Sequence, residues 1–304
     1  MSKPNFQLPE PSGKYCVLSY PAPGVLLVRL NRPKDLNCIN QEGHTELDQI
    51  WSWLDAEPTL NAGIITGTGR AFCAGADLKG METCTFIIAQ TKSRYADHIL
   101  TLADHFTEWN SMNSENRSRP MPPSGFGALS RRNGRKPIIA AVNGLAYGGG
   151  TEIIVNCDMV VAAKKATFAL PEVKRGVVAV AGALPRIVRT IGRPRAMEMA
   201  LTGRTVPAQE AFEWGLINRV VGDGDGEVVA AAVEYAKMIA ENSPDAVIVS
   251  REGIKMGWEG VGAEEGSRLL IENWYPRLVA GDNIKEGLRA FVEKRKPQWK
   301  AAKL

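Results

Sequence analysis

The chain has 304 residues, of which 44% are hydrophobic and 23% charged, and its formal net charge is +4. These values are ordinary for a soluble globular protein, and the length allows a large core without disulfides or metals. The sequence has no apolar run near the ~18 residues of a membrane span. Its five cysteines and three histidines are scattered, without paired metal spacing. A membrane-spanning chain, a disulfide scaffold and a zinc protein are therefore excluded.

The first quarter of the chain predicts a sheet with a helix packed on it. Residues 1–13 are polar and proline-rich, which is typical of a flexible tail and not of a signal peptide. Two β-rich runs, 15–20 and 25–30, predict a hairpin. Residues 42–56 carry apolar side chains at helical spacing, and 62–66 read as a buried strand. This order predicts a right-handed crossover and a parallel sheet.

The loop after this strand, residues 67–81, contains the small residues Ala74, Gly75 and Ala76. Such residues let backbone donors approach a ligand closely. The pair Gly67-x-Gly69 is superficially similar to a dinucleotide loop, but its third glycine is misplaced and no acidic residue closes a second strand. The loop therefore predicts a ligand contact that is not a dinucleotide fingerprint.

Residues 82–136 look like an enlarged connection. Apolar residues at helical spacing indicate that residues 99–109 are packed, whereas residues 110–136 hold six basic residues and one acidic residue. We favour a solvated loop for this basic stretch. The alternative is a lid or rim that contacts phosphates.

The stretch from Pro137 to Glu152 predicts a buried strand, an Asn-Gly turn and the start of a helix. Glycines 148–150 let the backbone approach a ligand, and the first N–H groups of a helix point at whatever lies before them, which suits an oxyanion. Glu152 follows Gly149 by three residues and shares its helix face. Glutamate is also common in a first helical turn, so this stretch alone does not define a catalytic site.

Residues after Glu152 predict further strands and helices of an α/β core, followed by a C-terminal region that is entirely helical. Short strands are expected at 159–162, 167–169 and 217–221, with short helices at 195–201 and 207–214. Longer helices are expected at about 228–242, 244–256, 263–279 and 284–295. We divide the chain into the tail 1–13, a core 14–225, a helical region 226–300 and a tail 301–304.

Three motifs in this order, GTGRAFCAGADLKGM, AAVNGLAYGGGTEIIVNCD and FALPEVKRG, resemble the enoyl-CoA hydratase/isomerase (crotonase) superfamily. The resemblance covers about residues 15–300, including LNRPKDLNCIN and EGLRAFVEKRKPQWK. FALPE and residues 124–127 are also similar to carnitinyl-CoA dehydratases. The resemblance implies a crotonase-like α/β spiral of ββα turns, then C-terminal helices that build trimers, often paired into hexamers. It also implies an acyl-CoA substrate and a place in fatty-acid β-oxidation.

The resemblance further assigns roles to individual residues. The backbone N–H groups of Ala76 and Gly149 would form an oxyanion hole, and Glu152 and Glu172 match the two catalytic glutamates. A larger set matches the contacts to coenzyme A: Ala74, Ala76, Asp77, Leu78, Lys79, Gly149, Phe291 and Lys294. The last two residues often come from another subunit in this family.

These residue types suit the addition of water to a 2-enoyl thioester. Negative charge develops on the thioester oxygen, and two fixed N–H donors stabilise it. We assign Glu152 to activating water and Glu172 to proton exchange at C2, and we expect the pair to titrate as a unit. Coenzyme A is part of the substrate, so no separate cofactor or metal is expected.

One segment departs from the family. Many hydratases carry a glycine-rich turn after the second glutamate, whereas this chain has Ala179-Val180-Ala181-Gly182-Ala183. Val180 adds bulk near the acyl group and restricts the backbone. The departure bears on the choice of substrate more than on the reaction, and the length and branching of the acyl group stay open.

The leading hypothesis is a hydro-lyase acting on 2-enoyl-CoA, and three alternatives stay open. A Δ3,Δ2-enoyl-CoA isomerase can work with one main carboxylate, and a carnitinyl-CoA dehydratase is a variant in substrate. Some relatives are reported to bind RNA, for which residues 131–136 would be the basic patch, but only Phe126 could supply stacking. Nucleic acid is therefore not the expected partner.

The last three residues, Ala302-Lys303-Leu304, resemble the peroxisomal address signal. The signal would function only if this end is exposed and native. Peroxisomal localisation is the expectation, with the cytoplasm as the alternative.

Overall fold

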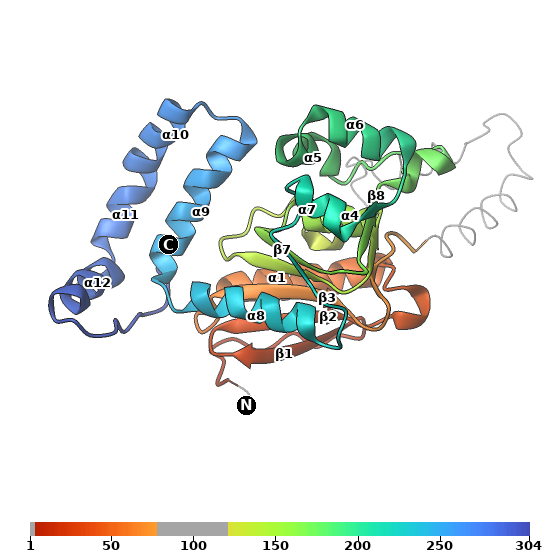
Figure 1. Ribbon diagram of the computed structural model, residues 1–304. Coiled ribbons are helices and arrows are strands. Elements are labelled where there is room, and N and C mark those ends of the chain that lie inside the picture. Colours follow the sequence, from red (N-terminus) through yellow and green to blue (C-terminus); the bar gives the residue numbers. More distant parts are fainter. Residues whose placement is uncertain (1–3, 78–120) are drawn as a thin grey trace, which may run out of the picture.

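The computed structural model describes residues 4–77 and 121–304 (Figure 1). Two sheets form the core of this part of the chain. The larger sheet contains, in spatial order, β1 (Cys16–Ala22), β2 (Val25–Leu30), β3 (Ala62–Gly67), β5 (Ile138–Val142), β7 (Met159–Ala163) and β10 (Arg219–Val221). The smaller sheet contains β4 (Ala71–Cys73), β6 (Leu145–Tyr147), β8 (Thr167–Ala169) and β9 (Val206–Pro207).

The larger sheet confirms the predicted hairpin and parallel order. β1 and β2 pair antiparallel, and every later pairing in this sheet is parallel. All residues of β3 and β5 are buried. Their continuous apolar sequence follows from burial on both faces, which is the rule for parallel strands covered by helices.

The smaller sheet consists of two- and three-residue strands that follow strands of the larger one. β4 follows β3, β6 follows β5 and β8 follows β7, and β6 leads directly into α4 (Gly149–Val155). This repetition gives the predicted spiral of ββα turns. The sequence reading missed β4 and β6 because three residues are too few to show a periodic pattern.

Helices cover both faces of the larger sheet (Figure 1). On one face, α1 (Gln41–Ala56) buries Leu47, Ile50, Trp51 and Leu54, the predicted apolar stripe. Asn40 caps this helix by accepting a hydrogen bond from the Gly43 N–H at 2.9 Å. On the other face, α8 (Glu227–Ala240) packs its alanines and valines against β2, β3, β5 and β7. The predicted helical region 226–300 therefore begins with a helix that belongs to the core.

Three further helices lie between β8 and β10. They are α5 (Ala183–Ile191), α6 (Arg193–Thr202) and α7 (Ala208–Glu213). The sequence reading predicted the second and third of these but not α5. The predicted helix over 99–109 lies outside the described residues.

The C-terminal helices form a separate layer beside the core (Figure 1). They are α9 (Pro244–Glu259), α10 (Ala263–Leu269), α11 (Tyr275–Ala280) and α12 (Asp282–Val292), with a π-helical turn (Leu270–Trp274) between α10 and α11. These helices confirm the predicted C-terminal helical region. None of the helices in the described part of the chain is long and apolar enough to cross a membrane.

Both terminal segments are packed where they are described, the N-terminal one against the core and the C-terminal one against α9. Phe6 packs against the rings of Tyr20 and Trp53, with centroid distances of 4.8 and 5.0 Å. At the other end, the Lys303 N–H donates to Asp245 Oδ1 at 3.0 Å, and Leu304 is buried beside Ile248 and Val249 of α9.

The described end of the basic stretch, residues 121–136, is only in part the solvated loop that we favoured. Arg132 is buried and pairs with Asp55 at 2.7 Å. Lys136 is also buried, and its Nζ donates to the carbonyl oxygens of Leu54 and Glu57 at 2.8 and 2.6 Å. These two cations hold the C-terminal end of α1, so they are unavailable to phosphates or RNA. Arg131 and Arg135 are exposed, whereas Arg117 and Arg119 lie outside the described residues.

Candidate active site

Glycines 148 and 149 sit where the chain passes from β6 into α4, and the structure leaves no room for a side chain there. Gly148 has a φ of 55°, and a Cβ at this position would stand 2.9 Å from Glu172 Oε1. A Cβ on Gly149 would stand 2.5 Å from the Phe126 ring. Real Cβ atoms do not approach other atoms so closely, and a positive φ favours glycine. Gly149 is therefore required by the packing of the Phe126 ring, whereas a side chain at Gly148 would force the carboxyl group of Glu172 to move.

Thr151 fixes this helix start against the smaller sheet. Its buried hydroxyl group lies 2.6 Å from the carbonyl oxygen of Ala146 in β6 and 2.8 Å from that of Ala169 in β8. The Gly148 N–H donates to the same Ala169 oxygen at 2.9 Å. The backbone at Gly149 is held in place by these contacts before any ligand arrives.

The loop after β4 brings a second backbone donor to the same place. The Ile39 N–H donates to the Gly75 carbonyl at 3.0 Å, and the Asp77 N–H donates to the Ile39 carbonyl at 3.1 Å. Successive residues of an extended chain point to opposite sides, so the N–H of Ala76 faces away from Ile39. Ala76 and Gly149 line one cavity of about 630 Å³. Two backbone N–H groups at one cavity are what an oxyanion hole requires.

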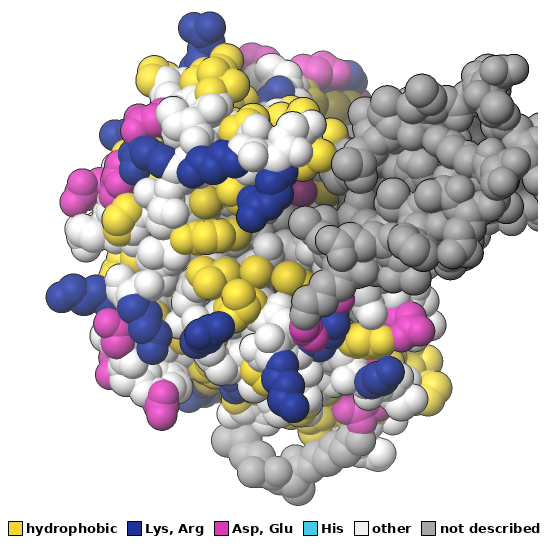
Figure 2. Space-filling view, turned by 90° about the vertical axis from the view of Figure 1, so that its right-hand side faces the viewer, with side chains coloured by type: hydrophobic (Ala, Val, Ile, Leu, Met, Phe, Trp, Pro, Cys, Tyr) yellow, Lys and Arg dark blue, Asp and Glu magenta, His cyan; other side chains and the backbone are white. Residues whose placement is uncertain are grey.

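The cavity has a size suited to a small-molecule ligand. Its apolar wall includes Phe126, Val177, Val178, Val180 and Ala181. Four basic side chains, Lys34, Arg70, Lys174 and Arg175, also line it and could contact anionic groups. In Figure 2, Lys and Arg side chains likewise surround exposed hydrophobic ones on the face that is shown.

Glu152 lies at the buried end of the site and is 4% exposed. Its Oε1 accepts a hydrogen bond from the Ala183 N–H, at the first residue of α5, at 3.3 Å. Burial raises the pKa of Glu152 to about 7, and the charge of Glu172 adds to this rise against the hydrogen bonds from Ala183, Ala181 and Gly182. A carboxyl group with this pKa can accept and release a proton near neutral pH.

Glu172 enters the cavity from the 3-10 helix η4 (Pro171–Arg175). Burial raises its pKa, while a backbone hydrogen bond and the charge of Arg175 oppose the rise. Its Oε2 is shielded from solvent and has no hydrogen-bond partner among the described residues. A buried carboxyl oxygen without a partner is costly, which indicates that it is placed for a ligand.

Six of the residues assigned from the sequence meet in this cavity: Ala74, Ala76, Asp77, Gly149, Glu152 and Glu172. Leu78 and Lys79 lie outside the described residues. Phe291 and Lys294, at the end of α12, do not line the cavity of their own chain, and Phe291 is 84% exposed. Among the described residues, no group of three or more His, Cys, Asp or Glu could hold a metal ion.

The sequence reading missed several residues that line the cavity. Lys174 and Arg175 directly follow Glu172, and this adjacency was a signal that could have been used. Tyr147 directly precedes the glycines 148–150, so its position in the sequence could also have indicated that it lies at the site. Lys34, Arg70 and Thr205 come from distant parts of the chain, and only the fold brings them to the cavity.

Comparison with known proteins shows the family to which the chain belongs. The sequence profile of the enoyl-CoA hydratase/isomerase family matches residues 22–109 and 126–302, so the chain belongs to this family. Its relatives are named hydratases, and it is an enzyme of the hydro-lyase type.

Three similar proteins, two compared by sequence and one by structure, show how far the likeness extends along the chain. A mevalonyl-coenzyme A hydratase of Aspergillus fumigatus is 47% identical over 295 residues, covering 97% of this chain and 98% of the relative. One of Beauveria bassiana is 48% identical over 287 residues, covering 94% and 95%. The crystal structure of an enoyl-CoA hydratase from Mycobacterium tuberculosis aligns over 96% of this chain and all of its own, with a TM-score of 0.78 and 30% identity.

Proposed function

We propose that this protein interconverts mevalonyl-CoA and the corresponding 2-enoyl thioester by removal and addition of water. Two similar proteins at 47% and 48% identity over nearly the whole chain are named mevalonyl-coenzyme A hydratases. The mevalonyl group is 3,5-dihydroxy-3-methylpentanoyl, so loss of water between C2 and C3 gives a 5-hydroxy-3-methylpent-2-enoyl thioester. This substrate would replace the straight-chain 2-enoyl-CoA of the sequence-based hypothesis.

The observation that carries the proposal is that two carboxyl groups and two backbone donors line one cavity. In the free site the charge of Glu172 favours the shared proton on Glu152, and the reaction uses the other form of this coupled pair, with the proton on Glu172. In the hydration direction, ionised Glu152 takes a proton from water while the water oxygen bonds to C3. The C2=C3 electron pair shifts toward the thioester, and the negative charge on its oxygen is stabilised by the N–H groups of Ala76 and Gly149. Protonated Glu172 then gives its proton to C2 as the thioester carbonyl re-forms.

Two further features support the substrate. The apolar side chains of Phe126, Val177 and Val180 line the cavity and suit a carbon chain that is branched at C3. The basic side chains at the same cavity suit the phosphates of coenzyme A.

The test measures absorbance of the conjugated thioester with 5-hydroxy-3-methylpent-2-enoyl-CoA, crotonyl-CoA and a 3-enoyl-CoA. We expect the largest kcat/KM with the first substrate, and a fall of about 10³-fold or more in Glu152→Gln and Glu172→Gln. Glu213→Gln, which changes an exposed glutamate on α7, serves as the control. Hydration of crotonyl-CoA alone would remove the mevalonyl assignment but keep the hydratase. Conversion of the 3-enoyl thioester alone would indicate an isomerase.

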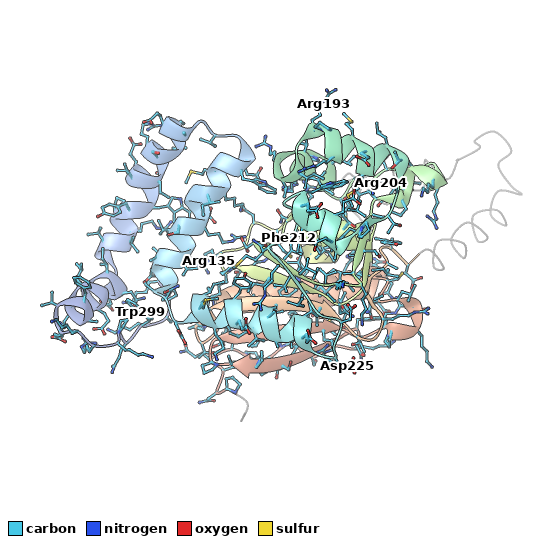
Figure 3. All side chains as sticks on the ribbon, viewed as in Figure 1. Arg135, Arg193, Arg204, Phe212, Asp225 and Trp299 are labelled. Carbon is cyan, nitrogen blue, oxygen red and sulfur yellow. The ribbon has the colours of Figure 1, made fainter. Side chains whose placement is uncertain are left out.

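We also propose that the enzyme is peroxisomal, on the basis of Ala302-Lys303-Leu304. Leu304 is buried, and its carbonyl oxygen accepts a hydrogen bond from Arg135, which lies between the core and α9 (Figure 3). A receptor could read the signal only after the tail is released from this contact. A fluorescent protein fused to residue 1 should give a punctate pattern that overlaps a peroxisomal marker. A diffuse signal with Leu304 at the free end would contradict the proposal.

A further inference from the structure

The segment from Arg32 to Ile39, between β2 and α1, is built around a buried asparagine. Asn37 is 1% exposed and has a φ of 57°. Its Nδ2 donates to the carbonyl oxygens of Thr68 and Ala71 at 3.0 and 2.8 Å, and its Oδ1 accepts from the Arg32 N–H at 3.0 Å. Asparagine is one of the few residues that tolerate this left-handed conformation. Asn37 therefore fastens the segment to the two ends of the turn between β3 and β4.

The same segment holds the loop that carries the Ala76 donor. The Ala74 N–H donates to the Leu36 carbonyl at 3.0 Å, and Ile39 pairs with both Gly75 and Asp77. These bonds engage the backbone on either side of Ala76. The direction of the Ala76 N–H is therefore set by the position of the segment 36–39.

The guanidinium group of Arg32 links this segment to the residue that follows Ala76. Its Nη1 lies 2.8 Å from Asp77 Oδ2 and donates to the Cys38 carbonyl at 2.8 Å, while its Nη2 lies 3.0 Å from Asp35 Oδ2. The side chains of Arg32 and Asp77 are only 21% and 13% exposed, so water screens the pair weakly. The two terminal nitrogens of a planar guanidinium group hold these three acceptors in a fixed fork, a geometry that the single nitrogen of an ammonium group cannot reproduce.

We propose that Arg32 is a positioning residue of the oxyanion hole. Through Asp77 and Cys38 it fixes the Ala76 N–H in the direction in which it meets the thioester oxygen in the transition state. This gives Asp77 a role different from the coenzyme A contact assigned from the sequence, because a carboxylate would repel phosphates. The inference rests on the proposed function only in requiring that Ala76 donates to the thioester oxygen.

The test compares Arg32→Gln and Arg32→Lys with Arg219→Gln as a matched control. Arg219 and Glu234 form an ion pair of 2.7 Å whose side chains are 45% and 61% exposed, and neither residue lines the cavity. With the best substrate found, we expect Arg32→Gln to lower kcat by ~10–100-fold, less than the ~10²–10³-fold typical of a deleted oxyanion donor, with KM changed by less than about threefold. Arg32→Lys should recover part of kcat, and Arg219→Gln should match the wild type.

A spectroscopic measurement distinguishes a role of Arg32 in positioning the oxyanion hole from a role in stabilising the fold. The carbonyl stretching band of bound cinnamoyl-CoA, labelled with ¹³C at C1, should lie at lower frequency than in free solution because the oxyanion donors polarise the bond. In Arg32→Gln this band should return part of the way toward the frequency of the free thioester. An unchanged band, or a lower melting temperature with unchanged band and kcat, would overturn the inference.

Two more outcomes are decisive. The double variant Arg32→Gln/Asp77→Asn should lower kcat no more than the stronger single variant, because both substitutions break the same ion pair. If the two effects on kcat multiply instead, the two residues act independently and the ion pair does not carry the effect. A wild-type protein that binds cinnamoyl-CoA without any shift of the carbonyl band would contradict the oxyanion hole itself. That result would overturn the proposed function before the role of Arg32 was tested.

Discussion

At the scale of single residues, the reactivity of Glu152 has a cost in stability. Burial raises its pKa from the ordinary 4.5 to about 7 in the folded protein. Below pH 4.5 the carboxyl group is protonated in both the folded and the unfolded states, and no penalty arises. Between pH 4.5 and about 7 the unfolded state ionises first, so folding becomes less favourable as the pH rises, and above pH 7 the penalty is complete.

This linkage predicts that Glu152→Gln raises the free energy of unfolding at alkaline pH. The gap between the two pKa values corresponds to about 3 kcal/mol at full ionisation. The stabilisation should therefore approach about 3 kcal/mol at pH 8 and be smaller at pH 5, as measured by denaturant unfolding at both values. Exposed Glu213→Gln should show no such dependence. An equal effect of Glu152→Gln at both values of pH would show that burial does not shift this group.

The packing at Gly148 predicts a specific loss of activity. In Gly148→Ala, the new Cβ would meet Glu172 Oε1 at 2.9 Å, so the carboxyl group must move. We expect kcat to fall by ~100-fold or more, because a displaced proton donor no longer reaches C2. Gly226→Ala is the matched control, since Gly226 also has a positive φ, of 84°, but no atom lies within 4 Å of the added Cβ. Steady-state kinetics and melting curves of both variants separate the collision from backbone strain.

At the scale of elements, the segment between η4 and α5 serves two purposes. It leads into Ala183, the first residue of α5, whose N–H donates to Glu152, and Gly182, with a φ of 125°, allows the turn into this helix. Earlier in the segment, Val180 lines the cavity with a side chain that is 46% exposed. One short segment thus sets both the environment of the proton acceptor and the width of the acyl site.

Replacing Val180 by glycine should widen the acyl site. We expect kcat/KM for a long, straight 2-enoyl-CoA to rise relative to that for the branched mevalonyl-derived thioester by ~10-fold, the lower end of the effect of one methylene group in an apolar pocket. Ala179→Gly, next to Val180 but not at the cavity, tests whether any loosening of this segment has the same effect. An unchanged ratio of kcat/KM in Val180→Gly would place the acyl group elsewhere in the cavity.

At the scale of the whole molecule, the C-terminal layer presents apolar side chains to solvent. Ile271, Tyr275, Leu288, Phe291 and Val292 are all more than half exposed. Exposed apolar groups of this kind mark surfaces that pack against another protein. Since Phe291 does not reach the cavity of its own chain, we propose that it contacts coenzyme A in a neighbouring copy of a homotrimer, which could pair into a hexamer.

The trimer predicts a mass of about 99 kDa from a chain of 33.0 kDa, or twice this for a hexamer. Light scattering during gel filtration measures it directly. Phe291→Ala should raise KM for acyl-CoA several-fold with little change in kcat, because it removes a contact far from the reacting atoms. Leu201→Ala, on exposed α6, is the control. A monomer at micromolar concentration that retains full activity would contradict the assignment.

The sequence by itself determined the hairpin, the parallel strands, α1 and the C-terminal helices. Each of these is long enough for its apolar spacing to reveal which face is buried. It also indicated Gly149 and Glu152 as neighbours, because residues three apart on a helix share a face. For Ala76 and Glu172 it supplied motifs and their order, and their assigned roles came from the family resemblance.

Only the tertiary structure decided how these pieces meet. Glu172 and the Ala76 loop lie far from Gly149 along the chain, and the sequence reading missed the short strands β4 and β6 that lead to the Ala76 loop and to Gly149. The structure also decided that Arg132 and Lys136 are buried, because a cation is held inside only where distant carboxylate and carbonyl groups face it. Likewise, Arg32 gained its place beside Asp77 through the pairing of Ile39 with Ala76, a contact between segments that local sequence does not encode.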